Sequence, residues 1–307
     1  MMISLLIAGL AAAAIPMTAP GPQGPLEGTL LDAGKGAPVV LIVPGSGPTD
    51  RDGNNPIGVT SAPYRLLAEA LGAKGVSTVR IDKRGLGGSK AAVADGNKVT
   101  IADYATDTHS WVTAIQKRTG QRCVWVLGHS EGSLIALYAA QQPAGICGVI
   151  SLSGAGRKLS DVIREQLRAN PANSPLLDSA MSAVDSLEKG QHVEVTNMHP
   201  ALQRLFDPQV QDFLIDMFRQ DPAKLAAALT VPLLIVQGER DLQVSVADAR
   251  ALAAAQPKAK LRLLPKMTHE LKDVDSDDKA AIAATSSDAS LPVDSGLVEA
   301  IVGFVKR

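Results

Sequence analysis

The sequence predicts an α/β fold, in which helices flank both faces of a mostly parallel central sheet and one helical segment is inserted. Short apolar runs alternate with stretches of helical periodicity along most of the 307 residues. This alternation is typical of parallel strands that are buried on both faces. It stops once, between residues 156 and 229. A Gly-x-Ser-x-Gly motif also stands between one apolar run and the helix after it, a context that supports this fold class.

The core elements follow from the spacing of apolar residues. The expected strands are short, mainly apolar runs, at 26–31, 38–43, 76–81, 123–127, 148–152, 231–237 and 259–264. The expected helices have apolar residues three and four positions apart, at 62–74, 101–119, 133–142, 245–255 and 296–306.

The interrupting segment is expected to cover a binding site. It contains helical patterns at 159–168, 176–188 and 208–220 and no convincing strand. It follows the carboxyl end of the strand 148–152, and open α/β sheets bind ligands at that edge. We therefore divide the chain into a core of residues 26–155 and 230–307 and a helical cap of residues 156–229.

The N-terminus differs from the rest of the chain. Residues 3–15 are an apolar run, shorter than the about 20 residues that a membrane-spanning helix needs. The run is typical of a secretory signal peptide over residues 1–19, with cleavage near Ala14 or Ala19 and a periplasmic or secreted product. Because no basic residue precedes the run, a frayed hydrophobic N-terminus or a buried N-terminal helix, in a cytoplasmic protein, is the alternative. No other segment is a candidate membrane span.

Composition excludes several classes of function. The net charge is −1 and no Lys/Arg cluster is present, so nucleic-acid binding is not expected. No metal-ligand spacing, phosphate loop or nucleotide fingerprint appears, so no metal and no cofactor is implied. The sequence specifies no oligomeric state.

The motif Gly128-His129-Ser130-Glu131-Gly132 directly follows the strand 123–127 and opens the next helix. A serine in such a tight turn projects its hydroxyl at a helix N-terminus, and small neighbours let strand and helix approach. Ser130 is therefore the predicted nucleophile.

A serine hydroxyl needs a base, and the base needs a partner that fixes its tautomer. His269 lies on a loop after the last predicted strand, whereas the alternative, His199, lies in the insertion. Asp241 lies on the polar loop after the strand 231–237, with Glu239 as its nearest rival. The order Ser130, Asp241, His269 is the order expected for this type of site.

Two backbone N–H groups should bind the oxyanion of the reaction. The first is that of Glu131, the residue after the nucleophile. The second should come from the loop 44–48, where Ser46 is the first choice and Gly47 the second.

Three segments, 45–54, 82–89 and 128–132, together resemble bacterial α/β-hydrolases of the serine-aminopeptidase-like S33 (hydrolase 4) group. The resemblance implies an α/β-hydrolase fold and the same roles for Ser130, Asp241, His269, Ser46 and Glu131. It also implies carboxylesterase activity, which many members have. This chain departs from the family in one position: Pro44 stands where a histidine often precedes the oxyanion glycine and supports its loop.

Two further polar groups have expected roles. Asp50, Arg51, Asp52 and Asn54 are expected to form a hydrogen-bonded loop scaffold, with binding of a polar substrate as the alternative. Asp82 and Arg84 are expected to pair with each other.

The chain has two cysteines, Cys123 and Cys147. They begin strands that are neighbours in this fold, about 4.8 Å apart. A cross-strand disulfide is the hypothesis, and two buried thiols are the alternative.

The expected function is that of a serine carboxylesterase that cleaves short- to medium-chain esters, with a small-molecule ester as its partner. An aminopeptidase or amidase on small peptides is the alternative, although no residue pattern singles out the anionic pocket that it would need. A catalytically silent binding protein on the same fold is the third reading.

Overall fold

The computed structural model describes residues 13–306 and contains one eight-stranded sheet with the order β1-β2-β4-β3-β5-β6-β7-β8. The pairs β1–β2 and β2–β4 are antiparallel, and all other neighbours are parallel. The predicted mostly parallel sheet is therefore confirmed. The strands are β1 (Ala14–Ala19), β2 (Leu26–Leu31), β3 (Val39–Val43), β4 (Ser77–Ile81), β5 (Val124–His129), β6 (Ile146–Leu152), β7 (Leu233–Gly238) and β8 (Lys260–Leu264).

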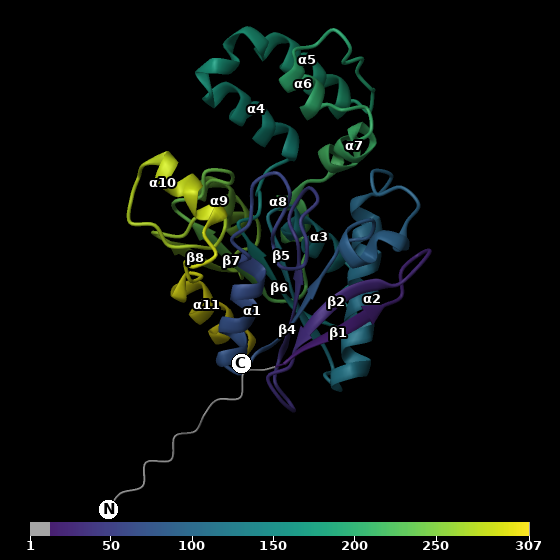
Figure 1. Cartoon of the computed structure of the whole chain (residues 1–307), viewed down its shortest axis with the longest axis vertical. Helices are drawn as coiled ribbons and strands as arrows, with labels where there is room; N and C mark the ends of the chain where they lie inside the picture. Colours follow the sequence, from purple (N-terminus) through teal and green to yellow (C-terminus); the bar gives the residue numbers. More distant parts are fainter. Residues whose placement is uncertain (1–12, 307) are drawn as a thin grey trace, which may run out of the picture.

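Helices cover both faces of the sheet (Figure 1). Helices α1 and α11 pack on one face, and α2, α3, α8 and α9 on the other. The helices are α1 (Pro63–Ala73), α2 (Ile101–Thr119), α3 (Glu131–Ala139), α4 (Leu159–Ala169), α5 (Leu177–Glu188), α6 (Pro200–Leu205), α7 (Gln211–Arg219), α8 (Pro222–Ala227), α9 (Val246–Ala255), α10 (Lys279–Ala284) and α11 (Ser295–Val305).

Each face of the sheet has its own hydrophobic core. Trp111 and Ile115 of α2 are fully buried on one face, and Leu67 and Ile301 are fully buried on the other. Every residue of β3 is buried, because a parallel strand between two helical layers has no solvent-facing side. This burial on both sides explains why the strands appear as continuous apolar runs in the sequence.

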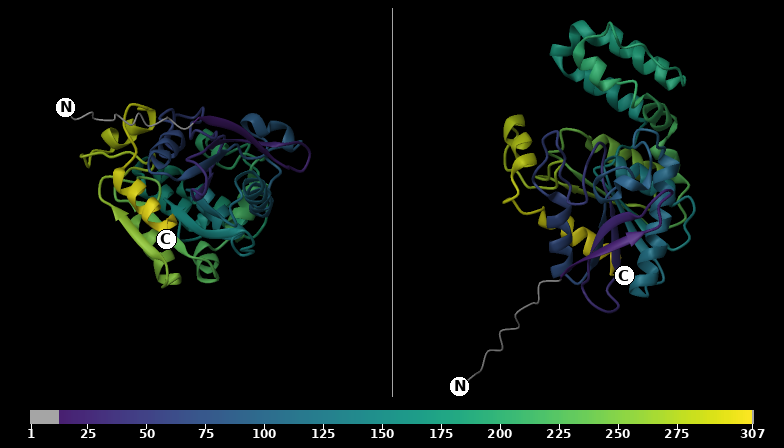
Figure 2. Two further views of the ribbon diagram at one scale, coloured as in Figure 1. Left: turned by 90° about the horizontal axis from the view of Figure 1, so that it is seen from below. Right: turned by 45° about the vertical axis from the view of Figure 1, so that its right-hand side comes forward.

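Helices α4 to α7 stand apart from these layers, beyond the carboxyl ends of the strands (Figures 1 and 2). They bury a third apolar cluster of their own, which includes Val184, Leu187, Phe206 and Phe218. Helix α8, which follows them, packs instead against α3 and α9 of the core. The helical segment expected at 156–229 thus consists of a separate group of helices and a final helix in the core layer.

The signal segment expected at 1–19 lies mostly outside the described residues, which begin at residue 13. Its end, Ala14–Ala19, forms the edge strand β1, and the side chains of Met17 and Ala19 are buried. Among residues 13–306, no helix is both long and apolar enough to cross a bilayer.

Cys123 and Cys147 form a disulfide, with 5.1 Å between their Cα atoms. It joins the amino ends of β5 and β6, where the register of the two strands shifts. The cross-strand hypothesis is confirmed, and the alternative of two buried thiols was wrong.

Candidate active site

Ser130 lies in a tight turn between β5 and α3, with φ 55° and ψ −120°. This conformation is unfavourable for a residue with a side chain. Backbone contacts hold it, since the Ser130 N–H donates to the Leu152 carbonyl at 2.9 Å. A Cβ at Gly128 would lie 1.9 Å from the Gly132 oxygen, and one at Gly132 would lie 2.3 Å from the Val43 oxygen. Strand and helix therefore approach as predicted, and both positions require glycine.

His269 and Asp241 contact each other as predicted. The Nδ1 of His269 lies 2.8 Å from Oδ2 of Asp241, whose side chain is 0% exposed. Asp241 also accepts hydrogen bonds from the backbone N–H groups of Gln243 and Val244, at 2.8 and 2.9 Å. The rival residues lie elsewhere: Glu239 is exposed, and His199 accepts from the Ala201 N–H at the start of α6.

This pairing sets the charge states of both groups. Burial disfavours the imidazolium of His269, but the charge and hydrogen bond of Asp241 outweigh it and raise the pKa of His269 above its ordinary 6.5. Burial likewise opposes ionisation of Asp241, and His269 outweighs it, so the pKa of Asp241 falls to about 2. Asp241 is therefore a carboxylate at neutral pH and suited to stabilise a protonated His269.

Two cavities meet at Ser130. A small polar one of about 70 Å³ is lined by Ser130, Ser46, His269 and Glu270, among others. A larger one of about 740 Å³ is lined by Ser130, Ser46, Gly47 and Glu131 together with many apolar side chains. The structure thus brings the predicted residues together at one place, with Asp241 behind His269.

The larger cavity lies between the core and helices α4 to α7. Its core side includes Lys83, Tyr104 and Leu134. The helices supply apolar side chains, among them Leu159, Val162, Leu205, Phe213, Leu214 and Met217. An apolar space of this size suits a hydrocarbon chain.

The support of the 44–48 loop comes from residues that the sequence analysis missed. The Gly45 N–H donates to Oη of Tyr64 at 3.1 Å, and Nζ of Lys83 donates to the Gly45 carbonyl at 2.8 Å. Both are long-range contacts, and no local pattern in the sequence pointed to either side chain. Tyr64 and Lys83 thus support the loop 44–48, in which Pro44 replaces the histidine that often has this role.

Tyr64 also ties this loop to His269. Because its oxygen accepts from the Gly45 N–H, its own proton can go to Nδ1 of His129, 2.8 Å away. The His129 Nε2–H then donates to the His269 carbonyl at 2.9 Å. Burial and the nearby charge of His269 lower the pKa of His129 to about 3, so His129 stays neutral and keeps this hydrogen-bond pattern.

The polar cluster after the loop is a scaffold, as expected. Oδ1 of Asp50 accepts from the N–H groups of Asp52 and Asn54, each at 2.9 Å. The Asn54 side chain in turn accepts from the Ala62 N–H at 2.9 Å. These bonds fix the chain between the 44–48 loop and α1.

The expected pair of Asp82 and Arg84 is wrong. Asp82 bonds to Arg51, whose Nη2 lies 2.5 Å from its carboxylate. Arg84 turns toward α2 and makes two bonds of 2.7 Å to Asp107. The two side chains leave the end of β4 toward different neighbours, which spacing along the chain does not reveal.

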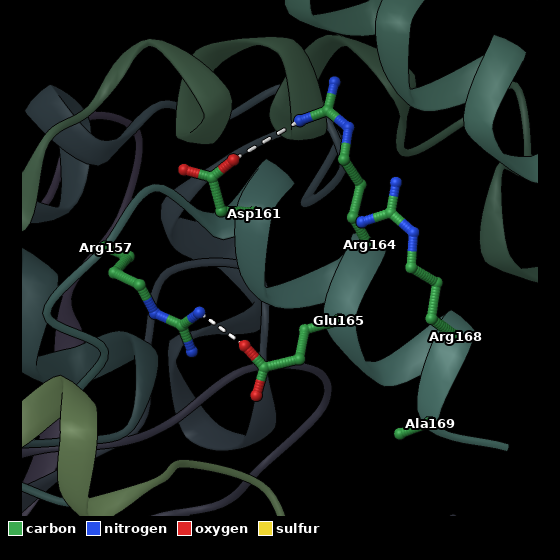
Figure 3. Close-up of a pocket in the computed structure, with 6 residues that line it drawn as sticks. All are labelled: Arg157, Asp161, Arg164, Glu165, Arg168 and Ala169. Atoms are coloured by element: carbon green, nitrogen blue, oxygen red, sulfur yellow. Dashed lines mark hydrogen bonds and ion pairs between the residues drawn. The ribbon is translucent and has the colours of Figure 1, made fainter.

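A hollow on the outer side of α4 is a different kind of surface. Figure 3 shows Arg157, Arg164 and Arg168 interleaved with Asp161 and Glu165 around it. Arg157 and Arg164 are held by carboxylates, among them Glu165 and Asp161. None of the predicted catalytic or oxyanion-binding residues lines this hollow.

Comparisons with known proteins give a family and a fold for this chain. Residues 57–276 match the family model described as serine aminopeptidase, S33 (Hydrolase_4). Esterase EstD of Thermotoga maritima is 28% identical over 215 residues, covering 69% of this chain and 48% of that protein. A monoacylglycerol lipase of Mycolicibacterium smegmatis is 26% identical, over 68% of this chain and 76% of the lipase. The match thus spans about half the length of the first relative and three quarters of the second.

Solved structures agree on the fold. The Pyrococcus furiosus esterase Pf2001 superposes with a TM-score of 0.57 at 15% identity, covering 97% of this chain and 93% of that one. Est1E from Butyrivibrio proteoclasticus gives 0.57 at 18% identity, with 93% and 98% covered. The fold is therefore that of the α/β-hydrolases. Within them, this chain belongs to the serine aminopeptidase S33 (Hydrolase_4) family.

Proposed function

We propose that this protein is a serine carboxylesterase in which Ser130 is the nucleophile, His269 the base and Asp241 the residue that orients the base. The carrying observation is the 2.8 Å bond between His269 and Asp241, in a site where His269 and Ser130 line the same cavity. Relatives named as an esterase and a monoacylglycerol lipase support the choice of esters.

The reaction would proceed by acyl transfer. The hydroxyl oxygen of Ser130 bonds to the ester carbonyl carbon while His269 takes the hydroxyl proton. The π-electron pair of the carbonyl moves onto the carbonyl oxygen, which becomes an oxyanion. The N–H groups of Ser46 and Glu131 would bind this oxyanion. Collapse of the intermediate releases the alcohol, which receives the proton from His269. Water, activated by the same base, then releases the acid and restores Ser130.

The two cavities suggest how an ester lies. The base gives its proton to the leaving group, so the alcohol belongs on the side of His269, in the small polar cavity. The acyl chain then belongs in the large cavity that apolar side chains line. Helices α4, α6 and α7 supply one wall of that cavity, which supports a role for residues 156–229 as a cap that sets acyl preference.

An aminopeptidase is less well supported. A free substrate amine would need an unpaired acidic group near Ser130. Glu131 is the nearest such residue in the chain, but its carboxylate is 2.8 Å from the ammonium of Lys83. Glu270 lines the small cavity with Ser130, and no ion pair with a Lys or Arg is found for it among the described residues, so it is the acidic group that such an amine would meet. The relatives named as an esterase and a monoacylglycerol lipase favour esters over peptides.

We also propose that the protein is exported and works in an oxidising compartment. The disulfide between Cys123 and Cys147 supports this, because such bonds persist mainly outside the cytoplasm. Processing near Ala14 would retain most of β1, whereas processing near Ala19 would remove it.

The test compares p-nitrophenyl acetate, butyrate and octanoate with an aminoacyl p-nitroanilide, for wild type and Ser130→Ala. Ester turnover that Ser130→Ala abolishes, with no anilide turnover, is the expected result. Anilide turnover would move the assignment to a peptidase, and ester turnover that survives in the variant would contradict the role of Ser130.

The orientation of the ester has its own test, in the isomers ethyl octanoate and octyl acetate. They contain the same atoms, with the long chain on the acyl side in one and on the alcohol side in the other. Ethyl octanoate should be the better substrate. Preference for octyl acetate would reverse the assignment of the two cavities and leave the esterase activity itself intact.

A further inference from the structure

We propose that Lys83 is a positioning residue that strengthens the oxyanion hole by polarising the peptide group between Gly45 and Ser46. The inference rests on the proposed function, in which the Ser46 N–H binds the oxyanion. It assigns a role to a buried charge that the acyl-transfer steps do not use.

Lys83 is buried at the centre of the site, and its side chain is 4% exposed. Its Nζ donates to the Gly45 carbonyl and to Oε1 of Glu131, each at 2.8 Å. The ring of Tyr104 lies 5.1 Å from the same atom. A buried lysine requires such partners, and both hydrogen-bond partners belong to the segments that flank Ser130.

The carbonyl of Gly45 and the N–H of Ser46 are two ends of one peptide group. An ammonium bonded to the carbonyl oxygen draws electron density toward that oxygen, which makes the N–H at the other end a stronger donor. The charge is already in place before the reaction, so no reorganisation is needed as the oxyanion forms. Lys83 thus acts through Ser46 and touches no reacting atom.

Glu131 gives Lys83 a second effect. Its backbone N–H is the other proposed oxyanion donor, yet its carboxylate, 4% exposed, would repel an oxyanion in the same low-dielectric site. The ion pair with Lys83 compensates the negative charge of that carboxylate. One ammonium therefore improves the donor on the loop and removes the repulsion at the elbow.

The experiment compares two ketones as inhibitors of the full-length protein. Ser130 adds to 1,1,1-trifluorodecan-2-one: its oxygen bonds to the ketone carbon, its proton passes to His269, and the carbonyl becomes an oxyanion. Decan-2-one has the same chain and largely binds without addition. The variants are Lys83→Met and, as a matched control, Lys90→Met, which removes an exposed lysine of the same segment.

Lys83→Met should weaken inhibition by the trifluoromethyl ketone about 10- to 100-fold. This effect is no larger than the effect of removing one whole oxyanion donor. Inhibition by decan-2-one should change less than about twofold, and kcat should fall while KM stays. Lys90→Met should match wild type. Equal weakening of both ketones, or of neither, would overturn the proposal, because a group that acts on the oxyanion must weaken the adduct-forming ketone selectively.

If Lys83→Met does not fold, inhibition of the Glu131→Gln variant by the same trifluoromethyl ketone tests the proposal. The amide still accepts from Lys83 but carries no negative charge, so the trifluoromethyl ketone should bind at least as tightly as to wild type. A tenfold weakening would contradict the role of Lys83. A wild-type protein that hydrolyses no ester and forms no adduct at Ser130 would instead refute the proposed function, an outcome distinct from these.

Discussion

The turn around Ser130 and helices α4, α6 and α7 line the same large cavity, yet the turn and the group of helices α4 to α7 are built in opposite ways. The turn is held by backbone contacts so close that a single methyl group at Gly132 would lie 2.3 Å from the Val43 oxygen. The helices have a small apolar cluster of their own. Exposed ion pairs join their surfaces, such as that of Arg164 with Asp185 at 2.6 Å.

We infer that the turn carries out the chemistry and that the helices select the substrate. Acyl transfer needs atoms fixed to within a fraction of an ångström, which close backbone packing provides. A chain-binding wall needs only apolar side chains of suitable size, so it tolerates change. We therefore expect substitutions in the turn to affect turnover of every substrate, and substitutions in the helices to affect the choice among substrates.

The largest expected effect is that of Gly132→Ala. The new Cβ forces strand and helix apart, and a shift of about 1 Å at the nucleophile costs about 100-fold in rate, with a loss of about 1–3 kcal/mol in unfolding free energy. Turnover of p-nitrophenyl acetate and the Tm measure both. Gly303→Ala is the control, since its added methyl group meets no atom within 4 Å. If Gly132→Ala and Gly303→Ala keep the same turnover and Tm, the turn does not depend on close backbone packing at Gly132.

A tenfold change is expected from Leu159→Trp, which adds bulk to the large cavity from the first turn of α4. The ratio of kcat/KM for octanoate over acetate should fall about tenfold, the lower end of what one methylene is worth in a hydrophobic pocket, while acetate turnover changes little. Ala169→Trp, at the other end of α4 and outside this cavity, should keep the wild-type ratio. If the two variants behave alike, α4 does not select the acyl chain.

The pH dependence should follow His269. Its base form is lost as pH falls through its pKa, which lies above 6.5, so kcat/KM should fall tenfold per unit below that point. The charge of Glu270 contributes to the raised pKa of His269, and Glu270→Gln should therefore move this acid limb to lower pH. Glu239→Gln, at an exposed position, should leave the profile in place. A shift to higher pH in Glu270→Gln would show that another group titrates.

The smallest effect on turnover is expected from removing the disulfide. Replacing Cys123 and Cys147 by Ala opens a link that spans 24 residues, which should lower the unfolding free energy by about 3 kcal/mol. Turnover of acetate should stay within about twofold, because the link joins the amino ends of strands whose carboxyl ends hold the site. Loss of turnover in a variant that remains folded at the assay temperature would mean that strain reaches Ser130 along β5.

Most of the core could be predicted, because strong local signals marked it. Residues 101–119 form α2 with the predicted bounds, since Thr100 and Asp103 make a capping box and Gly120 ends the helix. The residues of the site could be predicted because the carboxyl ends of parallel strands converge on one edge of the sheet.

What sequence analysis missed has physical reasons. Tyr64 and Lys83 act across 65 and 48 residues, and no periodicity encodes such contacts. Helices α6, α8 and α10 have six residues each, too few to show a helical repeat. Strand β1 lies in an apolar run whose composition also suits an export signal.

Within residues 13–306, the order of the strands places β1 and β8 at the two edges of the sheet. An open edge presents unpaired backbone groups that can extend the sheet into a second molecule and start aggregation. Pro16 lies within β1 and removes one donor there, and β8 carries Lys260 and Arg262, charges that disfavour stacking of a further strand. Both edges are thus protected against intermolecular pairing, so the protein should stay dispersed at concentrations where an unguarded sheet would form fibres.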